Sequence, residues 1–328
     1  MANKGSGDHR DKLPRTPPDA ASIVVNDTGR FISGVDTEAP ELPAPGVARP
    51  VRKVGFIVND TIETAVKQAD DTARLLTVRG VKVVQSHSAS PETSVNWTRD
   101  DHLDLIFTFG GDGTILRAAR YASPLQVPLV GINLGRVGFL TELNPWQVRE
   151  RLNLFLSGKY WLEKRAMLRA ELWRDGASVN TFLALNDVVV ARAALSRVVN
   201  CTLLVNEHRV TTYVADGVIV STPTGSTAYS MAAGGPIMHP ELRSLVVTPI
   251  APYLTVIRSL VLPDDNKLDL HIETDDEAFL TVDGQLHVPM RHGDTVSLIT
   301  SPDPCLFARV QDRAYFSSTL VNRLRRAE

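Results

Sequence analysis

The chain has 328 residues, of which 43% are hydrophobic and 22% are charged, and its formal net charge is −2. These values are typical of a globular protein of one large domain or two ordinary ones, and the lack of a basic stripe argues against a nucleic-acid partner. We find no apolar run long enough to span a membrane and no signal-peptide pattern. Two distant cysteines, Cys201 and Cys305, indicate a reducing compartment, and the eight histidines lack the spacing of metal ligands. We therefore expect a cytoplasmic protein without a membrane partner.

The first 50 residues have the composition of a disordered tail. They are rich in Pro, Gly, Ser, Asp and Lys, and residues 38–50 contain four prolines. Such a segment buries too little apolar surface to offset the entropy lost on ordering. One short apolar piece, residues 21–25, leaves an edge strand open as the alternative.

Residues 51–160 have the pattern of an α/β domain. Short apolar runs predict strands at residues 54–58, at 81–84, at the run ending at Phe109, and at 129–132. Residues 61–79 between the first two runs predict an amphipathic helix that ends at Gly80, so the sheet should be parallel. The first strand–helix turn, residues 58–61, has no G-x-G-x-x-G, so the standard dinucleotide fingerprint is absent.

Residues 161–305 have the pattern of a β-rich second domain. Apolar and polar residues alternate over 268–273, as expected of a half-exposed antiparallel strand. Residues 206–207 and 283–284 fall between strand-like runs and predict hairpin turns. The basic last segment, residues 306–328, is helical in pattern near its end, and we expect it to pack back on the α/β domain.

The stretch FTFGGDGT, residues 107–114, places one carboxylate inside a glycine turn. Residues 103–109 predict a strand buried on both faces, and residues 114–121 predict the start of a helix. Glycines let a backbone approach a phosphate, and the N–H groups of a helix N-terminus favour negative charge. Asp112 would repel such a phosphate, which points to chemistry or to a metal ion at this position. The alternative is a tight turn in which Asp112 caps the helix.

A second polar segment, residues 215–230, predicts a strand that runs into a hydroxyl-rich loop and then a short helix. Ser226 is a good N-cap residue, and Tyr229 offers an aromatic face or a phenol. The hydroxyls and N–H groups could bind a sugar or a phosphate. The alternative is a Ser/Thr-rich turn that caps a helix.

Asn186 and Asp187 interrupt an apolar run, residues 182–190, that otherwise predicts one buried strand. A polar pair in such a place must find partners, because its desolvation is costly. Asn186 can present a donor and an acceptor to a base edge, and Asp187 can accept from ribose hydroxyls. The alternative is a turn at the end of a strand.

Taken in order, these motifs resemble those of the NAD kinase family over about residues 51–325. The matching motifs are GGDGT at 110–114, G-x-N-x-G-x-x-G-F-L at 131–140, Asn-Asp at 186–187, D-G-x-x-x-S-T-P-x-G-S-T-A-Y-S at 216–230, and GGP at 234–236. GGDGT also occurs in lipid-kinase-like proteins, whereas the long string at 216–230 is far more specific.

The resemblance implies an α/β N-terminal domain, a β-rich C-terminal domain and an active site between them. It also implies that ATP, with Mg²⁺ or another divalent cation, phosphorylates the 2′-hydroxyl of the adenosine ribose of NAD to give NADP. Family members are usually cytoplasmic homodimers or homotetramers, and some accept polyphosphate as the donor. We expect NAD and ATP as substrates and a second copy of the chain as the partner.

The resemblance also implies site residues, with Asp112 as the general base. The NAD-binding positions are Asp112, Gly113, Arg117, Asn186, Asp187, Arg197, Asp216, Thr227, Ala228, Tyr229, Ser230, Ala251 and Gln285, and the phosphate loop comprises Gly110, Gly111, Gly113 and Thr114. In this assignment Asn186 meets the adenine, Asp187 meets the ribose, and Asp216 contacts the nicotinamide end across a subunit boundary.

Three positions depart from the family pattern. Tyr253 stands where a His often follows the Pro-Ile-x-Pro motif, Asp187 replaces a common Glu, and the first 50 residues have no counterpart.

Two rival functions are the alternatives to an NAD kinase. A lipid or diacylglycerol kinase would explain GGDGT but not the string at 216–230, and a catalytically inactive NAD(H) sensor would require a damaged glycine turn, whereas GGDGT is intact.

Overall fold

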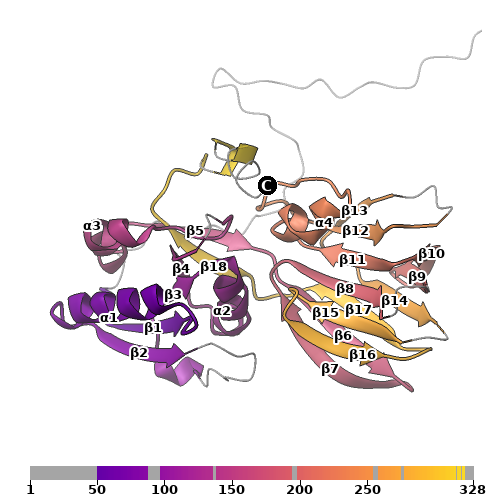
Figure 1. Ribbon diagram of the computed structural model, residues 1–328, viewed down its shortest axis with the longest axis horizontal. Helices are drawn as coiled ribbons and strands as arrows, with labels where there is room; N and C mark the ends of the chain where they lie inside the picture. The colour runs from indigo at the N-terminus through magenta and orange to yellow at the C-terminus, as the bar shows by residue number, and fades with distance from the viewer. Residues whose placement is uncertain are drawn as a thin grey trace, which may run out of the picture. The chain divides into compact units, whose positions relative to one another are not determined.

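The computed structural model describes residues 50–87, 97–135, 138–193, 198–253, 258–274, 277–314, 316–318 and 320–321 (Figure 1). The described residues all belong to one unit, Val47–Glu328. The predicted disordered tail, apart from Pro50, lies outside them, as do most residues of the predicted C-terminal helix.

The first sheet has the strand order β2-β1-β3-β4-β18-β5. Its strands are β1 (Lys53–Val58), β2 (Lys82–His87), β3 (Leu105–Gly110), β4 (Leu129–Asn133), β5 (Trp161–Arg165) and β18 (Cys305–Arg309). The first four strands pair in parallel, β18 pairs in parallel with β4, and β5 is antiparallel to β18. β18, drawn in yellow in Figure 1, thus brings the end of the chain into a sheet begun by residues 53–58.

Helices cover both faces of this sheet. They are α1 (Glu63–Thr77), α2 (Asp112–Leu125) and α3 (Pro145–Leu156), with a 3₁₀ turn η1 (Arg99–Asp101) before β3. Successive residues of β3 point to opposite faces, so Phe107 and Phe109 pack with α1 and α3, whereas Ile106 packs with α2. Burial on both faces explains why the strand is almost uniformly apolar. Gly80 has φ of 75°, as expected of the residue that ends a helix.

The remaining strands form two antiparallel sheets, ordered β10-β9-β14-β17-β6-β7 and β13-β12-β11-β8-β15-β16. The first contains β6 (Leu168–Arg174), β7 (Ala177–Ala184), β9 (Val199–Val205), β10 (His208–Ala215), β14 (Leu268–Glu273) and β17 (Thr295–Thr300). The second contains β8 (Asp187–Arg192), β11 (Gly217–Ser221), β12 (Ser244–Ile250), β13 (Leu260–Pro263), β15 (Ala278–Val282) and β16 (Leu286–Met290). One apolar cluster draws residues from both sheets, including Leu270 and Val220, so the sheets pack face to face.

The structure confirms the predicted fold class and both hairpin turns. Asn206 and Glu207 connect β9 to β10 with φ of 48° and 69°, and Asp283 and Gly284 connect β15 to β16 with φ of 50° and 64°. The left-handed backbone is what tight hairpin turns require. No helix among the described residues combines the length and the apolar character needed to cross a membrane.

Two boundaries differ from the sequence-based expectation. Residues 182–190 are not one strand, because β7 ends at Ala184 in one sheet and β8 begins at Asp187 in the other. Residues 161–165, which we assigned to the β-rich domain, form β5 and pair with β18 in the first sheet. In the first case the change of sheet falls at the polar pair Asn186 and Asp187.

Candidate active site

Asp112 is the first residue of α2, and the segment that follows β4 holds its carboxylate. The backbone N–H of Phe139 donates to Oδ2 at 2.8 Å, and that of Leu140 donates to Oδ1 at 3.2 Å. The cap position of α2 is Gly111, so the alternative in which Asp112 caps the helix is wrong. These two bonds fix the orientation of the Asp112 carboxylate.

Two glycines make room for this arrangement. A Cβ at Gly138 would lie 2.1 Å from Oδ1 of Asp112, and a Cβ at Gly110 would lie 2.2 Å from Oγ1 of Thr114. A Cβ at Gly111, by contrast, would meet no atom within 4 Å, and Gly113 is exposed. The turn is therefore packed against Asp112 on one side and open at the N-terminus of α2, where a phosphate would bind.

Asn186 and Asp187 form the corner at which the chain passes from β7 to β8. The carboxylate of Asp283 accepts from the backbone N–H groups of Leu185 at 3.1 Å, Asn186 at 2.8 Å and Asp187 at 3.2 Å. In return, the N–H of Asp283 donates to the carbonyl of Asp187 at 2.9 Å. The corner is thus set by a residue that the sequence analysis treated only as part of a hairpin turn.

This corner contains two buried carboxyl groups. Burial, and then the charge of Asp283, raise the pKa of Asp187 to about 7. Burial also raises the pKa of Asp283, although its hydrogen bonds from the corner's N–H groups and the charge of Arg120 oppose the shift. Asp187 is therefore poised to gain or lose a proton near neutral pH.

The hydroxyl-rich loop that follows β11 packs against the same corner. The N–H of Thr222 donates to the carbonyl of Asn186 at 2.9 Å, and its Oγ1 donates to the carbonyl of Leu185 at 2.6 Å. A Cβ at Gly225 would lie 2.2 Å from the carbonyl oxygen of Asn186. The close approach of the two backbones requires glycine at this position.

Ser226 does not cap a helix, contrary to the sequence-based expectation. The short helix α4 (Tyr229–Ala232) has Ala228 at its cap position, and a 3₁₀ turn, η2 (Gly225–Thr227), precedes it. The Ser226 hydroxyl instead donates to the carbonyl of Pro223 at 2.7 Å and accepts from the N–H of Met238 at 2.9 Å. A buried hydroxyl binds whichever backbone groups lack partners, and here these are a carbonyl of the loop and an N–H beyond α4.

The other predicted residues of this loop differ in their exposure. Tyr229 is 47% exposed, whereas Ser230 is buried and its Oγ lies 3.1 Å from Oγ1 of Thr248. Thr227 is half-buried and binds the carbonyl of Thr224.

Gln285 joins the loop between β15 and β16 to α2. Its Nε2 donates to the carbonyl of Gly113 at 2.8 Å, and its Oε1 accepts from Arg120 at 2.5 Å. Gln285 thus contacts the first turn of α2, and Asp283, two residues earlier in the same turn, contacts the corner of Asn186 and Asp187. Arg117, half-buried, lies on α2 between the two residues that Gln285 contacts.

Asp216 and Ala251 lie elsewhere. Asp216 precedes β11 and forms a two-point ion pair with Arg192, at 2.8 and 2.9 Å. Its N–H donates to the carbonyl of Ile250, next to Ala251, which has φ of 43°. The hydroxyl-rich loop begins at the other end of β11, about 16 Å away at roughly 3.3 Å per residue. Arg197 lies outside the described residues.

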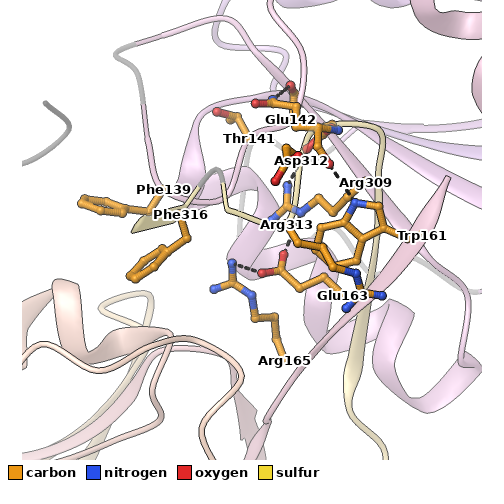
Figure 2. Close-up of a pocket in the computed structure, with 11 residues that line it drawn as sticks. Phe139, Thr141, Glu142, Trp161, Glu163, Arg165, Arg309, Asp312, Arg313 and Phe316 are labelled. Atoms are coloured by element: carbon orange, nitrogen blue, oxygen red, sulfur yellow. Dashed lines mark hydrogen bonds and ion pairs between the residues drawn. The ribbon is translucent and has the colours of Figure 1, made fainter. Parts of the chain in front are cut away.

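A chain of buried ion pairs contacts two segments of the site (Figure 2). Arg309 binds Glu142 at 3.2 Å and Glu163 at 2.7 Å, and Glu163 binds Arg165 at 2.8 Å. The chain touches the site at both ends, because Arg309 donates to the carbonyl of Leu140 at 2.9 Å and Arg165 donates to Oγ1 of Thr224 at 3.3 Å. The sequence analysis missed these residues; the available signal was charge inside otherwise strand-like segments.

The cavity beside this chain has a volume of about 30 Å³. That volume holds a water molecule but no nucleotide. Figure 2 shows Phe139 and Phe316 among the residues that line it. We therefore assign the cavity to the support of the site and not to nucleotide binding.

Comparison with known proteins gives matches over most of the chain. The family model described as the ATP-NAD kinase N-terminal domain matches residues 54–160, and that of the ATP-NAD kinase C-terminal domain matches residues 185–310. The NAD kinase of Chloroflexus aurantiacus is 38% identical over 277 residues, which cover 84% of this chain and 100% of the relative.

Two solved structures have the same fold. The crystal structure of an NAD kinase from Archaeoglobus fulgidus in complex with ATP is 26% identical with a TM-score of 0.64, and the match covers 84% of this chain and 99% of that one. Yeast NADH kinase complexed with NADH has a TM-score of 0.71 at 24% identity, over 83% of this chain and 87% of that one. By its two domain models and its relatives, the chain belongs to the ATP-NAD kinase family.

Proposed function

We propose that this enzyme transfers the γ-phosphoryl group of ATP to the 2′-hydroxyl of the adenosine ribose of NAD, giving NADP. The observation that carries the proposal is the cluster in which Asp112, at the open N-terminus of α2, is joined through Gln285 and Asp283 to the corner formed by Asn186 and Asp187. A carboxylate, a phosphate-binding helix end and a polar corner are what this reaction requires. Membership of the family and the ATP complex of the Archaeoglobus relative support the same assignment.

Asp112 acts as the general base in this mechanism. The two N–H groups that bind its carboxylate fix its orientation, so the carboxylate can align the 2′-hydroxyl for attack on the phosphorus. Because phosphoryl transfer passes through a loose transition state, the hydroxyl keeps its proton until late, and a carboxylate suffices as the acceptor.

The adenosine half of NAD binds against the corner and the hydroxyl-rich loop. Asn186 meets the adenine, Asp187 accepts from the ribose hydroxyls, and the exposed ring of Tyr229 supplies an aromatic face. The N–H groups at the start of α2 bind donor phosphate, as helix N-termini do. NADH and polyphosphate remain alternative substrates to be tested in the same assay.

Mg²⁺ enters with ATP. No group of three or more His, Cys, Asp or Glu side chains that could hold a metal ion occurs among the described residues. Mg²⁺ in kinases is commonly held by substrate phosphates with one or two carboxylates, so this chain needs no dedicated cage. When bound, the ion would offset the charge of the phosphates beside Asp112.

Asp216 and Ala251 serve the site of a second copy of the chain in a homodimer or homotetramer. Support comes from their position, about 16 Å along β11 from the start of the hydroxyl-rich loop.

Mixed oligomers test this proposal. If Asp112→Asn and Asp216→Ala act in different chains of one site, co-refolding the two inactive variants should restore about a quarter of wild-type activity, since half the dimers are mixed and each has one intact site. No recovery in proven mixed oligomers would place Asp216 in its own chain's site.

The two free cysteines support a cytoplasmic location.

The direct test is NADP formation by the purified protein with NAD, ATP and Mg²⁺, read through an NADP-specific dehydrogenase. The wild type should produce NADP, and Asp112→Asn should lose roughly 10²- to 10⁴-fold in turnover while it stays folded and binds NAD. Near-normal turnover in that variant would remove Asp112 from the mechanism. NAD binding without NADP formation, under ATP and polyphosphate alike, would favour the sensor instead.

A further inference from the structure

One side chain, Gln285, bonds to two points on the same face of α2. Gly113 and Arg120 are seven residues apart, about two helical turns, so their groups lie on one side of the helix. Gln285 donates to the Gly113 carbonyl at 2.8 Å and accepts from Nη2 of Arg120 at 2.5 Å. The amide has a single satisfying orientation, because a guanidinium only donates and a carbonyl only accepts.

The same turn carries Asp283, two residues earlier. Its carboxylate holds the N–H groups of Leu185, Asn186 and Asp187, so it sets the corner proposed to bind adenosine. Residues 283–285 therefore contact both halves of the site: the start of the catalytic helix and the nucleoside-binding corner.

Arg120 anchors this turn to α2. Burial lowers its pKa, and the nearby charge of Asp283 opposes that shift; Tyr121 also raises it and Arg117 lowers it. Its Nη1 is buried and lacks a hydrogen-bond partner within the described part of the chain, so the bond to Gln285 is the directed contact that the guanidinium makes there. A half-buried cation with one N–H group unsatisfied in this way is costly unless its position is useful.

We propose that Arg120 is a positioning residue of the kinase reaction: through Gln285 it fixes the Gly113 carbonyl, and hence the first turn of α2 with Asp112, against the Asn186–Asp187 corner. Arg120 touches no substrate in this scheme. The inference rests on the proposed function, since the reaction being aligned is phosphoryl transfer to a ribose hydroxyl.

Steady-state kinetics of Arg120→Met give the first test. The kcat for NADP formation should fall roughly ten- to hundredfold, as expected when a reacting group is misplaced by about 1 Å. The KM for NAD should stay within about threefold, because the corner keeps its three bonds to Asp283. Arg120→Lys, which retains the cation, should recover part of the kcat.

The matched control is Arg99→Met, because Arg99 donates to the carbonyl of Pro124 at the other end of α2 and lies outside the site. Its kcat should equal that of the wild type. Gln285→Met provides a double-mutant cycle, in which the losses of Arg120→Met and Gln285→Met should not add. Additive losses, or a kcat for Arg120→Met within about twofold of wild type, would overturn the proposal.

Hydrogen–deuterium exchange separates this inference from the proposed function. Peptides covering residues 110–116 should exchange faster in Arg120→Met than in the wild type and in Arg99→Met, whether or not the wild type makes NADP. Unchanged exchange there would overturn the positioning role. Absence of NADP from the wild type, with faster exchange in Arg120→Met, would reject only the kinase assignment.

Discussion

The backbone of Gly138 lies against the carboxylate of Asp112 so closely that a Cβ there would come within 2.1 Å of Oδ1. The same segment supplies the two N–H groups that bind this carboxylate. Gly138 is therefore required by the packing of the Asp112 carboxylate.

Gly138→Ala should abolish most turnover. The added methyl group must displace the Asp112 carboxylate, the segment 139–140 or both, and a displacement of about 1 Å costs roughly a hundredfold in rate. NADP formation per folded molecule measures the effect. Gly135→Ala is the control in the same loop, because its Cβ would meet no atom within 4 Å. Equal turnover in both variants would contradict the packing requirement.

Arg309→Met should destabilise the enzyme by about 3–5 kcal/mol, because it leaves the buried carboxylates of Glu142 and Glu163 without their shared cation. It should also lower turnover, since Arg309 binds the carbonyl of Leu140, whose N–H holds Asp112. Denaturant unfolding and the NADP assay give the two measurements.

The control for Arg309→Met is Arg313→Met. Arg313 is exposed and stacks 4.5 Å from the ring of Trp161. An exposed cation–π contact is worth about 0.5–1 kcal/mol, so this variant should lose far less. Similar losses in both would mean that the buried chain of ion pairs contributes no more than a surface contact.

Asp187→Asn should stabilise the unliganded protein at pH 8. The pKa of Asp187 is raised from its ordinary value to about 7 in the folded state, so between pH 4 and 7 the native protein binds the extra proton and stability falls as pH rises. Above pH 7 the full cost of the buried charge remains, up to about 4 kcal/mol. Asparagine removes it, so the gain should appear at pH 8 and vanish near pH 4.

Asp294→Asn provides the opposite sign for comparison. Burial raises the pKa of Asp294, but hydrogen bonding from Arg174 outweighs burial and keeps this pKa below its ordinary value. The ionised Asp294 therefore contributes stability at neutral pH, and this stability is lost as pH falls. This variant should therefore be less stable than the wild type at pH 8. Thermal unfolding across pH 4–8 measures the stability of both variants. If Asp187→Asn is less stable than the wild type at pH 8, the claim that the buried charge of Asp187 destabilises the protein is wrong.

The affinity for NAD should rise with pH up to about 7. Ribose hydroxyls donate to the ionised form of Asp187, and protonation removes that acceptor, so the Kd should increase up to tenfold for each pH unit below 7. Asp283 and Arg120 also face this corner and shape the transition. Calorimetric titration without ATP measures it. Asp187→Asn should show weaker and pH-independent binding; a flat profile in the wild type would exclude Asp187 from the ribose contact.

Local pattern identified the α/β half of the fold well. The glycine turn before α2 and both hairpin turns are encoded in neighbouring residues, since steric limits on φ and on backbone approach act within a few positions. The pattern was wrong about one strand boundary. Residues 182–190 are apolar on both sides of Asn186 and Asp187, and periodicity does not distinguish one interrupted strand from two strands in different sheets.

The sequence by itself determined the family, the glycine turn with Asp112, and the alternation of helices and strands, because these depend on residue types at short fixed spacings. Only the tertiary structure decided what holds the site. The N–H groups that bind Asp112 come from residues 27 and 28 positions away, Gln285 reaches Gly113 across 172 positions, and Arg309 reaches Leu140 across 169. Partners so distant are brought together by the packing of whole sheets and helices, which no local spacing records.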